Sequence, residues 1–202
     1  MRAIGKISFL VLVLVASAAA QAHLQSAPPA AGSGPSFDVS FGYSYITVAT
    51  PDTGRVNLNG LDAGGHADFS PRWGATVDAG YARASNVLGT GQNGYILSFL
   101  GGPVFYPIEH RNNRLFLHAL IGASLVGGAV PVTGTNYLHG WVARPSYALG
   151  GGMEQALFGP FAMRVAGDYL RTSYVNSDAV VEPENDLRVT VSVVFRLNAR
   201  RY

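Results

Sequence analysis

Residues 186–197 (DLRVTVSVVFRL) alternate apolar and polar side chains with a period of two. Successive side chains of a β-strand point to opposite faces, so this segment predicts a strand with one apolar face. The apolar face holds Leu187, Val189, Val191, Val193, Phe195 and Leu197, and the other face holds Arg188, Thr190, Ser192 and Arg196. The alternation alone leaves open whether the apolar face meets a protein core or lipid.

Seven earlier segments have the same strand character: residues 37–47, 60–69, 73–81, 95–106, 115–126, 146–154 and 161–170. Short turns follow the second, fourth and sixth of them. Longer polar segments at 47–58, 83–93, 128–142 and 172–185 predict four loops at the other end. We expect an all-β fold, an eight-stranded antiparallel up-and-down transmembrane β-barrel. Residues 95–126 are apolar on both faces, so the pattern leaves their register open.

The N-terminus has the pattern of a secretory signal peptide. Arg2 and Lys6 precede the apolar run ISFLVLVLVASAAA, and Ala20-Gln21-Ala22 fits a cleavage site. An N-terminal membrane anchor is the alternative. We expect residues 1–22 to be the signal peptide, residues 23–36 a flexible periplasmic leader, and residues 37–202 the barrel with a short C-terminal tail.

The composition favours a membrane barrel over a soluble domain. Charged residues make up 13% of the chain, against about 25% in typical globular proteins. After removal of Arg2 and Lys6, 12 arginines balance 12 carboxylates, so no basic surface favours a nucleic-acid partner. Beyond the signal peptide no apolar run is long enough for a membrane helix, and closed strands are the other way to satisfy the backbone in lipid.

The polar faces of the predicted strands carry charges of both signs. In a barrel these side chains would fill a narrow interior, where they should pair with one another. The predicted interior network consists of Asp62, His66, Asp68, Asp78, Glu154, Arg164, Asp168, Arg188 and Arg196.

Aromatic side chains recur near both ends of the predicted strands, as expected for rings at two membrane interfaces. Phe37, Phe69, Trp73, Phe105, Phe161 and Phe195 lie near the short turns, and Tyr45, Tyr81, Tyr95, Trp141, Tyr147 and Tyr169 lie near the long loops.

Several segments together resemble those of the small OmpA-type (OmpA- and OmpX-like) outer-membrane β-barrel proteins: LNGLDAG, FLGGPVF, LFLHALIG, ALGGGME, RVAGDYL and NDLRVTVSVVFRL. The resemblance covers about Phe37 to Leu197. It implies secretion to the periplasm, insertion into the cell outer membrane by the barrel-assembly machinery, and contact with membrane lipid and lipopolysaccharide. We further expect a monomer whose four extracellular loops meet a partner of unknown identity.

Three motifs have alternative chemical interpretations. Residues 89–94 match the dinucleotide pattern G-x-G-x-x-G, but no helix is expected after them, so we interpret them as a loop. Asp62, His66 and Asp68 share a face and could hold a metal, although an interior hydrogen-bonded network is favoured. His118 is interpreted as a satisfied interior histidine. No histidine has a serine at a spacing suited to hydrolysis, so we expect no catalytic, cofactor or metal site.

Two main functions remain, together with a soluble alternative. A filled interior would make the protein a closed structural or surface-interaction barrel. Interior glycines could instead leave space for a porin-like channel for small polar solutes: Gly60, Gly64, Gly80, Gly150 and Gly152. A secreted lipocalin-like carrier would require the apolar faces to point inward.

Overall fold

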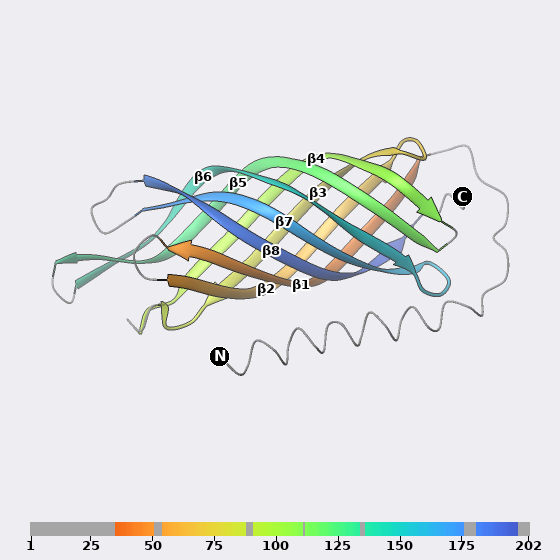
Figure 1. Ribbon diagram of the computed structural model, residues 1–202. Coiled ribbons are helices and arrows are strands. Elements are labelled where there is room, and N and C mark those ends of the chain that lie inside the picture. Colours follow the sequence, from red (N-terminus) through yellow and green to blue (C-terminus); the bar gives the residue numbers. More distant parts are fainter. Residues whose placement is uncertain are drawn as a thin grey trace.

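A computed structural model describes residues 35–50, 54–87, 91–110, 112–133, 136–175 and 181–197. The signal peptide, most of the leader and the end of the C-terminal tail lie outside these residues. Eight strands close into one barrel (Figure 1). Their bounds are β1 Ser36–Thr50, β2 Gly54–Asp68, β3 Trp73–Ala84, β4 Gly94–His110, β5 Asn113–Thr133, β6 Asn136–Ala156, β7 Phe161–Val175 and β8 Val181–Arg196.

Each strand pairs antiparallel with its neighbours in sequence, and β8 returns to pair with β1. At this closing seam Val39 lies opposite Phe195, and Val48 lies opposite Asp186. Closure leaves no open edge along the wall, so the backbone groups of every strand have partners on both sides. The predicted eight-stranded antiparallel up-and-down barrel is confirmed.

Three of the four predicted loops are largely strand. Residues 47–50 and 54–58 extend β1 and β2, residues 128–133 and 136–142 extend β5 and β6, and residues 172–175 and 181–185 extend β7 and β8. Only residues 83–93 lie mainly between strands, after β3 ends at Ala84. On β1 and β2 the alternation continues but its polarity is reversed: the inward Val48 and Leu58 are buried and apolar, whereas Asn57 is exposed. The apolar-out pattern used to predict the strands therefore ends there.

The two ends of the barrel therefore differ. We call the end with the extended strand pairs the hairpin end, on the left in Figure 1, where β5 and β6 reach furthest. The opposite end, which we call the short-turn end, has tight connections. At one of them Trp73 N donates to Ser70 Oγ at 2.9 Å, and at another Gly159 has a φ of +54°, which glycine adopts without strain.

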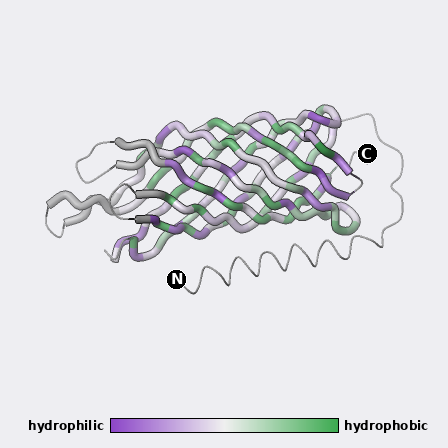
Figure 2. The backbone as a smooth tube through the Cα atoms, viewed as in Figure 1, coloured by the Kyte–Doolittle hydropathy of each residue, from purple (hydrophilic) through white to green (hydrophobic). Residues whose placement is uncertain are grey.

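Side chains alternate between the outside and the inside of the wall. Figure 2 shows hydrophobic and hydrophilic residues interspersed along the strands. The structure settles the register left open by the sequence: Leu117 and Ile121 of β5 point outward, whereas Phe116, His118 and Leu120 point inward. A register shift between Phe105 and Ile108 interrupts the pairing of β4 with β5. Within the described residues, no helix is long and apolar enough to cross a membrane.

Candidate functional site: the charged interior of the barrel

The interior near the short-turn end contains the Asp68 cluster, formed by Ser36, Asp68, Tyr106 and Arg114. Asp68 ends β2, and its Oδ2 accepts hydrogen bonds from both terminal nitrogens of Arg114 at 2.9 Å. Its Oδ1 accepts the Tyr106 hydroxyl at 2.9 Å, and the guanidinium of Arg114 lies 3.7 Å from the centre of the Tyr106 ring. Asp68 therefore has a cation and a hydroxyl group to offset its loss of water.

The neighbouring Glu154 cluster contains one acid and two arginines. Glu154 is fully buried. Its Oε2 accepts from Nε and Nη2 of Arg164 at 3.2 and 2.6 Å, and its Oε1 accepts from Nη2 of Arg196 at 2.6 Å. Register brings these groups together, because Glu154 on β6 lies directly opposite Arg164 on β7.

The Arg188 cluster lies further along the axis and draws side chains from five strands. Arg188 Nη2 is 2.7 Å from Asp168 Oδ2, and Arg188 Nη1 is 2.7 Å from Asp78 Oδ1 and 3.7 Å from Asp62 Oδ2. His118 of β5 contacts the other oxygen of Asp168 at 2.7 Å. Arg188 is 2% exposed, so one buried guanidinium organises three carboxylates.

His66 lies among hydroxyl groups. Its ring makes hydrogen bonds with Ser40 Oγ at 3.1 Å and Thr76 Oγ1 at 2.7 Å, and Nη1 of Arg164 also contacts the ring. Asp62, His66 and Asp68 share the inner face of β2, but each has different main partners. Within the described part of the chain, no group of three or more His, Cys, Asp or Glu side chains is arranged to hold a metal ion.

All nine residues of the predicted network point into the interior, where the structure divides them among the Asp68, Glu154 and Arg188 clusters and the His66 contacts. Sequence reasoning missed Arg114, because residues 109–114 were expected to form a turn, and it missed Tyr106, because residues 95–106 are apolar on both faces and their register was left open. Extending the alternation of β5 back by two residues from Phe116 would have placed Arg114 inside. His118 was expected inside, but only the fold reveals its partner on β7.

The remaining chemical motif is only partly described. Gly89 and Thr90 of the G-x-G-x-x-G sequence lie outside the described residues, and Gly94 opens β4.

Aromatic side chains form rows on the outer wall. Near the short-turn end, ring centres of Trp73 and Phe105 are 4.8 Å apart, and those of Phe161 and Phe195 are 5.4 Å apart; Phe69 is also exposed there. Near the hairpin end, Tyr81 and Tyr95 are 6.4 Å apart, and Tyr95 and Trp141 are 5.8 Å apart. Tyr169 is exposed at this end as well.

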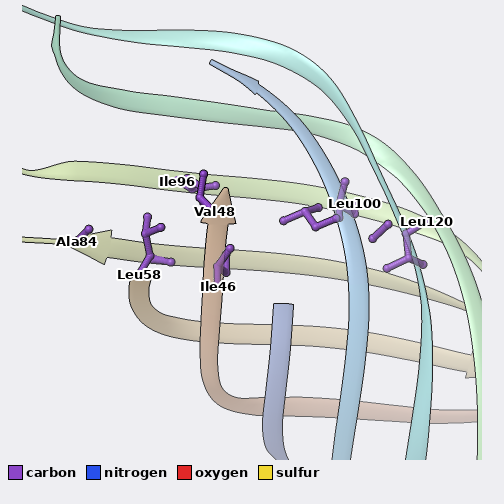
Figure 3. Packing of buried hydrophobic residues seen from close by; sticks show 10 residues of the cluster. Ile46, Val48, Leu58, Ala84, Ile96, Leu100 and Leu120 are labelled. Atoms are coloured by element: carbon purple, nitrogen blue, oxygen red, sulfur yellow. The ribbon is translucent and has the colours of Figure 1, made fainter. Parts of the chain in front are cut away.

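The inner wall toward the hairpin end is apolar. We call this cluster of buried side chains the apolar layer, and Figure 3 shows it with seven of its members labelled. It comprises Ile46, Val48, Leu58, Ala82, Ala84, Ile96, Leu100, Leu120, Ala148 and Leu170. A cavity of about 30 Å³ lies between the Arg188 cluster and His66, which is room for roughly two water molecules.

Interior glycines do not leave an open pore. A Cβ on Gly150 would lie 2.1 Å from Asp168 Oδ1, one on Gly64 would lie 2.7 Å from Ser40 Oγ, and one on Gly80 would lie 2.9 Å from Ser98 Oγ. A Cβ on Gly60 or on Gly152 would lie 1.9 Å from a carbonyl oxygen of the adjacent strand. At Gly60, Gly150 and Gly152 backbone atoms occupy the space that a side chain would need, whereas at Gly64 and Gly80 the nearest atom is a serine hydroxyl oxygen.

Neither a protein-family model nor a curated protein sequence matches the chain. Solved structures do. Ail, the attachment invasion locus protein of Yersinia pestis, has a TM-score of 0.58 at 15% identity, covering 81% of this chain and 99% of Ail. Neisserial surface protein A (NspA) has a TM-score of 0.61 at 14% identity, covering 80% of this chain and 98% of NspA. Identities this low establish a shared fold.

The number of strands, the closure of the barrel and the similarity to Ail and NspA agree with the resemblance of the strand sequences to those of small OmpA-type barrels. The chain has the fold of the small eight-stranded outer-membrane β-barrel proteins.

Proposed function

We propose that the chain is an integral outer-membrane β-barrel protein whose wall faces lipid and whose interior is closed. One observation carries the proposal: the distribution of polarity is the reverse of that in a soluble protein. Ile121 and Val77 are 74% and 65% exposed on the outer wall, whereas Glu154 and Asp168 are 0% and 1% exposed inside. Water would penalise such an apolar surface, while lipid would favour it.

The spacing of the aromatic rows supports this orientation. On β5, Leu117 lies opposite Phe105 of one row, and Gly127 lies opposite Tyr95 of the other. Ten residues span about 34 Å along a strand, which a tilt of about 45° reduces to about 24 Å. The apolar band of outer-membrane barrels is about 25 Å tall. The rows therefore lie where the two membrane interfaces would be.

The proposed maturation follows the sequence: residues 1–22 direct secretion and are removed, residues 23–36 remain in the periplasm, and the barrel-assembly machinery inserts the rest as a monomer. At the hairpin end Arg83 is exposed, with its guanidinium 5.6 Å from the ring centre of Tyr95. This position suits contact with phosphate groups of outer-leaflet lipid or lipopolysaccharide.

The proposed role is envelope structure or surface interaction through the hairpin end. The extended pairs of β1–β2, β5–β6 and β7–β8 would project beyond the membrane, with β5–β6 the longest. The filled interior supports this role over a channel.

Cell fractionation combined with heat-modifiable gel mobility tests the proposal. We expect the full chain to fractionate with the outer membrane and to migrate faster before heating than after it. Spin labels at Val77 and Ile121 should sense hydrocarbon, and a matched label at exposed Asn57 on β2 should sense water. Recovery of the protein free in the periplasm, with water-exposed labels at Val77 and Ile121, would instead support the soluble carrier.

A further inference from the structure

The inner wall changes from charged to apolar along the barrel axis. The apolar layer draws its members from seven strands around the interior as a ring, and the strand register relates them in two separate series. Val48 lies opposite Asp186, Asp186 opposite Leu170, Leu170 opposite Ala148, and Ala148 opposite Leu120. On the other side of the ring, Ile46 lies opposite Leu58, and Ala82 lies opposite Ile96. Seven strands contribute apolar side chains, and β8 contributes Asp186.

An apolar ring and an ionic cluster obstruct solutes in different ways. Ions and water interact favourably with mobile charged side chains, which exchange partners as a solute passes. An apolar constriction offers no hydrogen bonds, so water leaves it and ions lose their hydration there. In this interior, the Arg188 cluster adjoins a cavity with room for water, and Leu120 lines that cavity where it meets the apolar layer. Leu100 and Leu170 are buried within the apolar layer and do not line the cavity.

We propose that the apolar layer, rather than the salt bridges, is the barrier that keeps ions and small polar solutes from crossing the barrel. The inference rests on the proposed function and names the residues that enforce closure. Leu120 and Leu170 are the determining side chains, because both are buried and both adjoin Ala148, which is too small to close its side of the ring alone.

Asp186 is the polar gap in the ring. It is 1% exposed, and it lies between Val48 and Leu170. Its Oδ2 accepts the Thr172 hydroxyl at 2.8 Å, while its Oδ1 has no hydrogen-bond partner among the described residues. A carboxyl group in this position is the point at which water would enter the layer.

Planar-bilayer recording of the full chain tests the inference through a matched pair of double variants. Leu120→Thr with Leu170→Thr and Leu120→Val with Leu170→Val remove similar volume, but only threonine adds a hydroxyl group. We expect the threonine pair to raise small-ion conductance about tenfold or more, the change produced by lowering a barrier by about 1.4 kcal/mol. The valine pair should remain as closed as the unaltered protein.

An ionic variant completes the comparison. Asp78→Asn with Arg188→Gln removes the guanidinium and one of its three carboxylates, and it leaves Asp62 without Arg188 and Asp168 with His118 alone. Arg196→Gln, at a partly exposed position, serves if that variant does not fold. Both should stay closed. The inference would be overturned if these ionic variants conducted small ions, or if the threonine pair did not. Heat-modifiable mobility shows whether each variant is folded. A threonine pair that folds but does not conduct refutes only the apolar barrier. An unaltered chain that forms no barrel in bilayers refutes the proposed function and the inference with it.

Discussion

The effect on stability of replacing a charged side chain in this interior depends on the partners of that side chain. Glu154 holds two arginines, whereas Asp186 has one oxygen without a hydrogen bond. Breaking a buried pair leaves an uncompensated charge, while removing an unsatisfied polar group removes a desolvation cost. Buried acids in the same barrel should therefore respond to substitution with opposite signs.

Neutralising Glu154 should be strongly destabilising. Glu154→Gln leaves Arg164 and Arg196 without their carboxylate, so we expect the free energy of unfolding to fall by about 3–5 kcal/mol. Urea unfolding of the barrel from lipid vesicles measures the change. Glu109→Gln is the control, because Glu109 is partly exposed and 3.4 Å from Arg114, and exposed pairs contribute about 1 kcal/mol or less. Equal losses in the two variants would contradict the proposed importance of burial.

Replacing Asp186 with an apolar side chain should stabilise the protein. Asp186→Leu completes the apolar layer beside Val48 and Leu170, at the cost of the Thr172 hydrogen bond. The unsatisfied oxygen costs about 1–3 kcal/mol and the hydrogen bond contributes about 1 kcal/mol, so we expect a net gain of about 1 kcal/mol. The same urea titration checks it, with the paired Asp168→Leu as a control that should lose stability. A loss for Asp186→Leu would show that this carboxyl group is well satisfied.

At the scale of elements, the sequence predicted the strands best where one face is apolar and the other polar. Within the barrel wall, residues such as Val39 and Asp38 differ because one face meets the outside and one the interior. Residues 47–58 reverse this contrast, because Val48 and Leu58 are buried inside and Asn57 is exposed outside. Their pairing depends on the partner strand, which composition does not record.

The projecting β5–β6 ribbon has a free edge that carries a proline. Among the described residues, β6 pairs with β7 only over Tyr147–Ala156, while β6 itself begins at Asn136. Pro145 is exposed near the base of this edge, and proline offers no N–H to an incoming strand.

Restoring that donor should favour self-association. For Pro145→Val we expect the dimer association constant to rise about fivefold, corresponding to one added hydrogen bond of about 1 kcal/mol. Light scattering of the detergent-solubilised barrel measures it. Pro103→Val, at an exposed position of β4 between β3 and β5, is the control and should stay monomeric. An unchanged association constant for Pro145→Val would show that this edge is protected in another way.

At the scale of the whole molecule, the sequence predicted the closed barrel and the charges inside it, but not how those charges pair. The alternation placed Asp168 and Arg188 on one face. That they share a cluster with His118 follows from the closure and shear of eight strands, which bring β5, β7 and β8 together across the interior. The apolar layer was missed for a related reason: each of seven strands contributes only one or two of its members, and each member alone looks like an ordinary exception to the alternation.

Orientation in lipid makes the cost of an outward charge depend on depth. Ile121 lies four residues from Leu117, at one aromatic row, and six from Gly127, at the other, so it should lie near the middle of the membrane. We expect Ile121→Arg to lower the free energy of unfolding from lipid by about 2–4 kcal/mol, and Asn57→Arg, beyond the hairpin-end row, by about 0–1 kcal/mol. Urea unfolding in vesicles supplies both values, and repeating it in detergent micelles should shrink the difference, because a micelle deforms around a charge more easily than a bilayer. In a soluble barrel, Arg at the exposed Ile121 position would lower the free energy of unfolding only slightly. Equally small losses for Ile121→Arg and Asn57→Arg would therefore show that this wall does not face lipid.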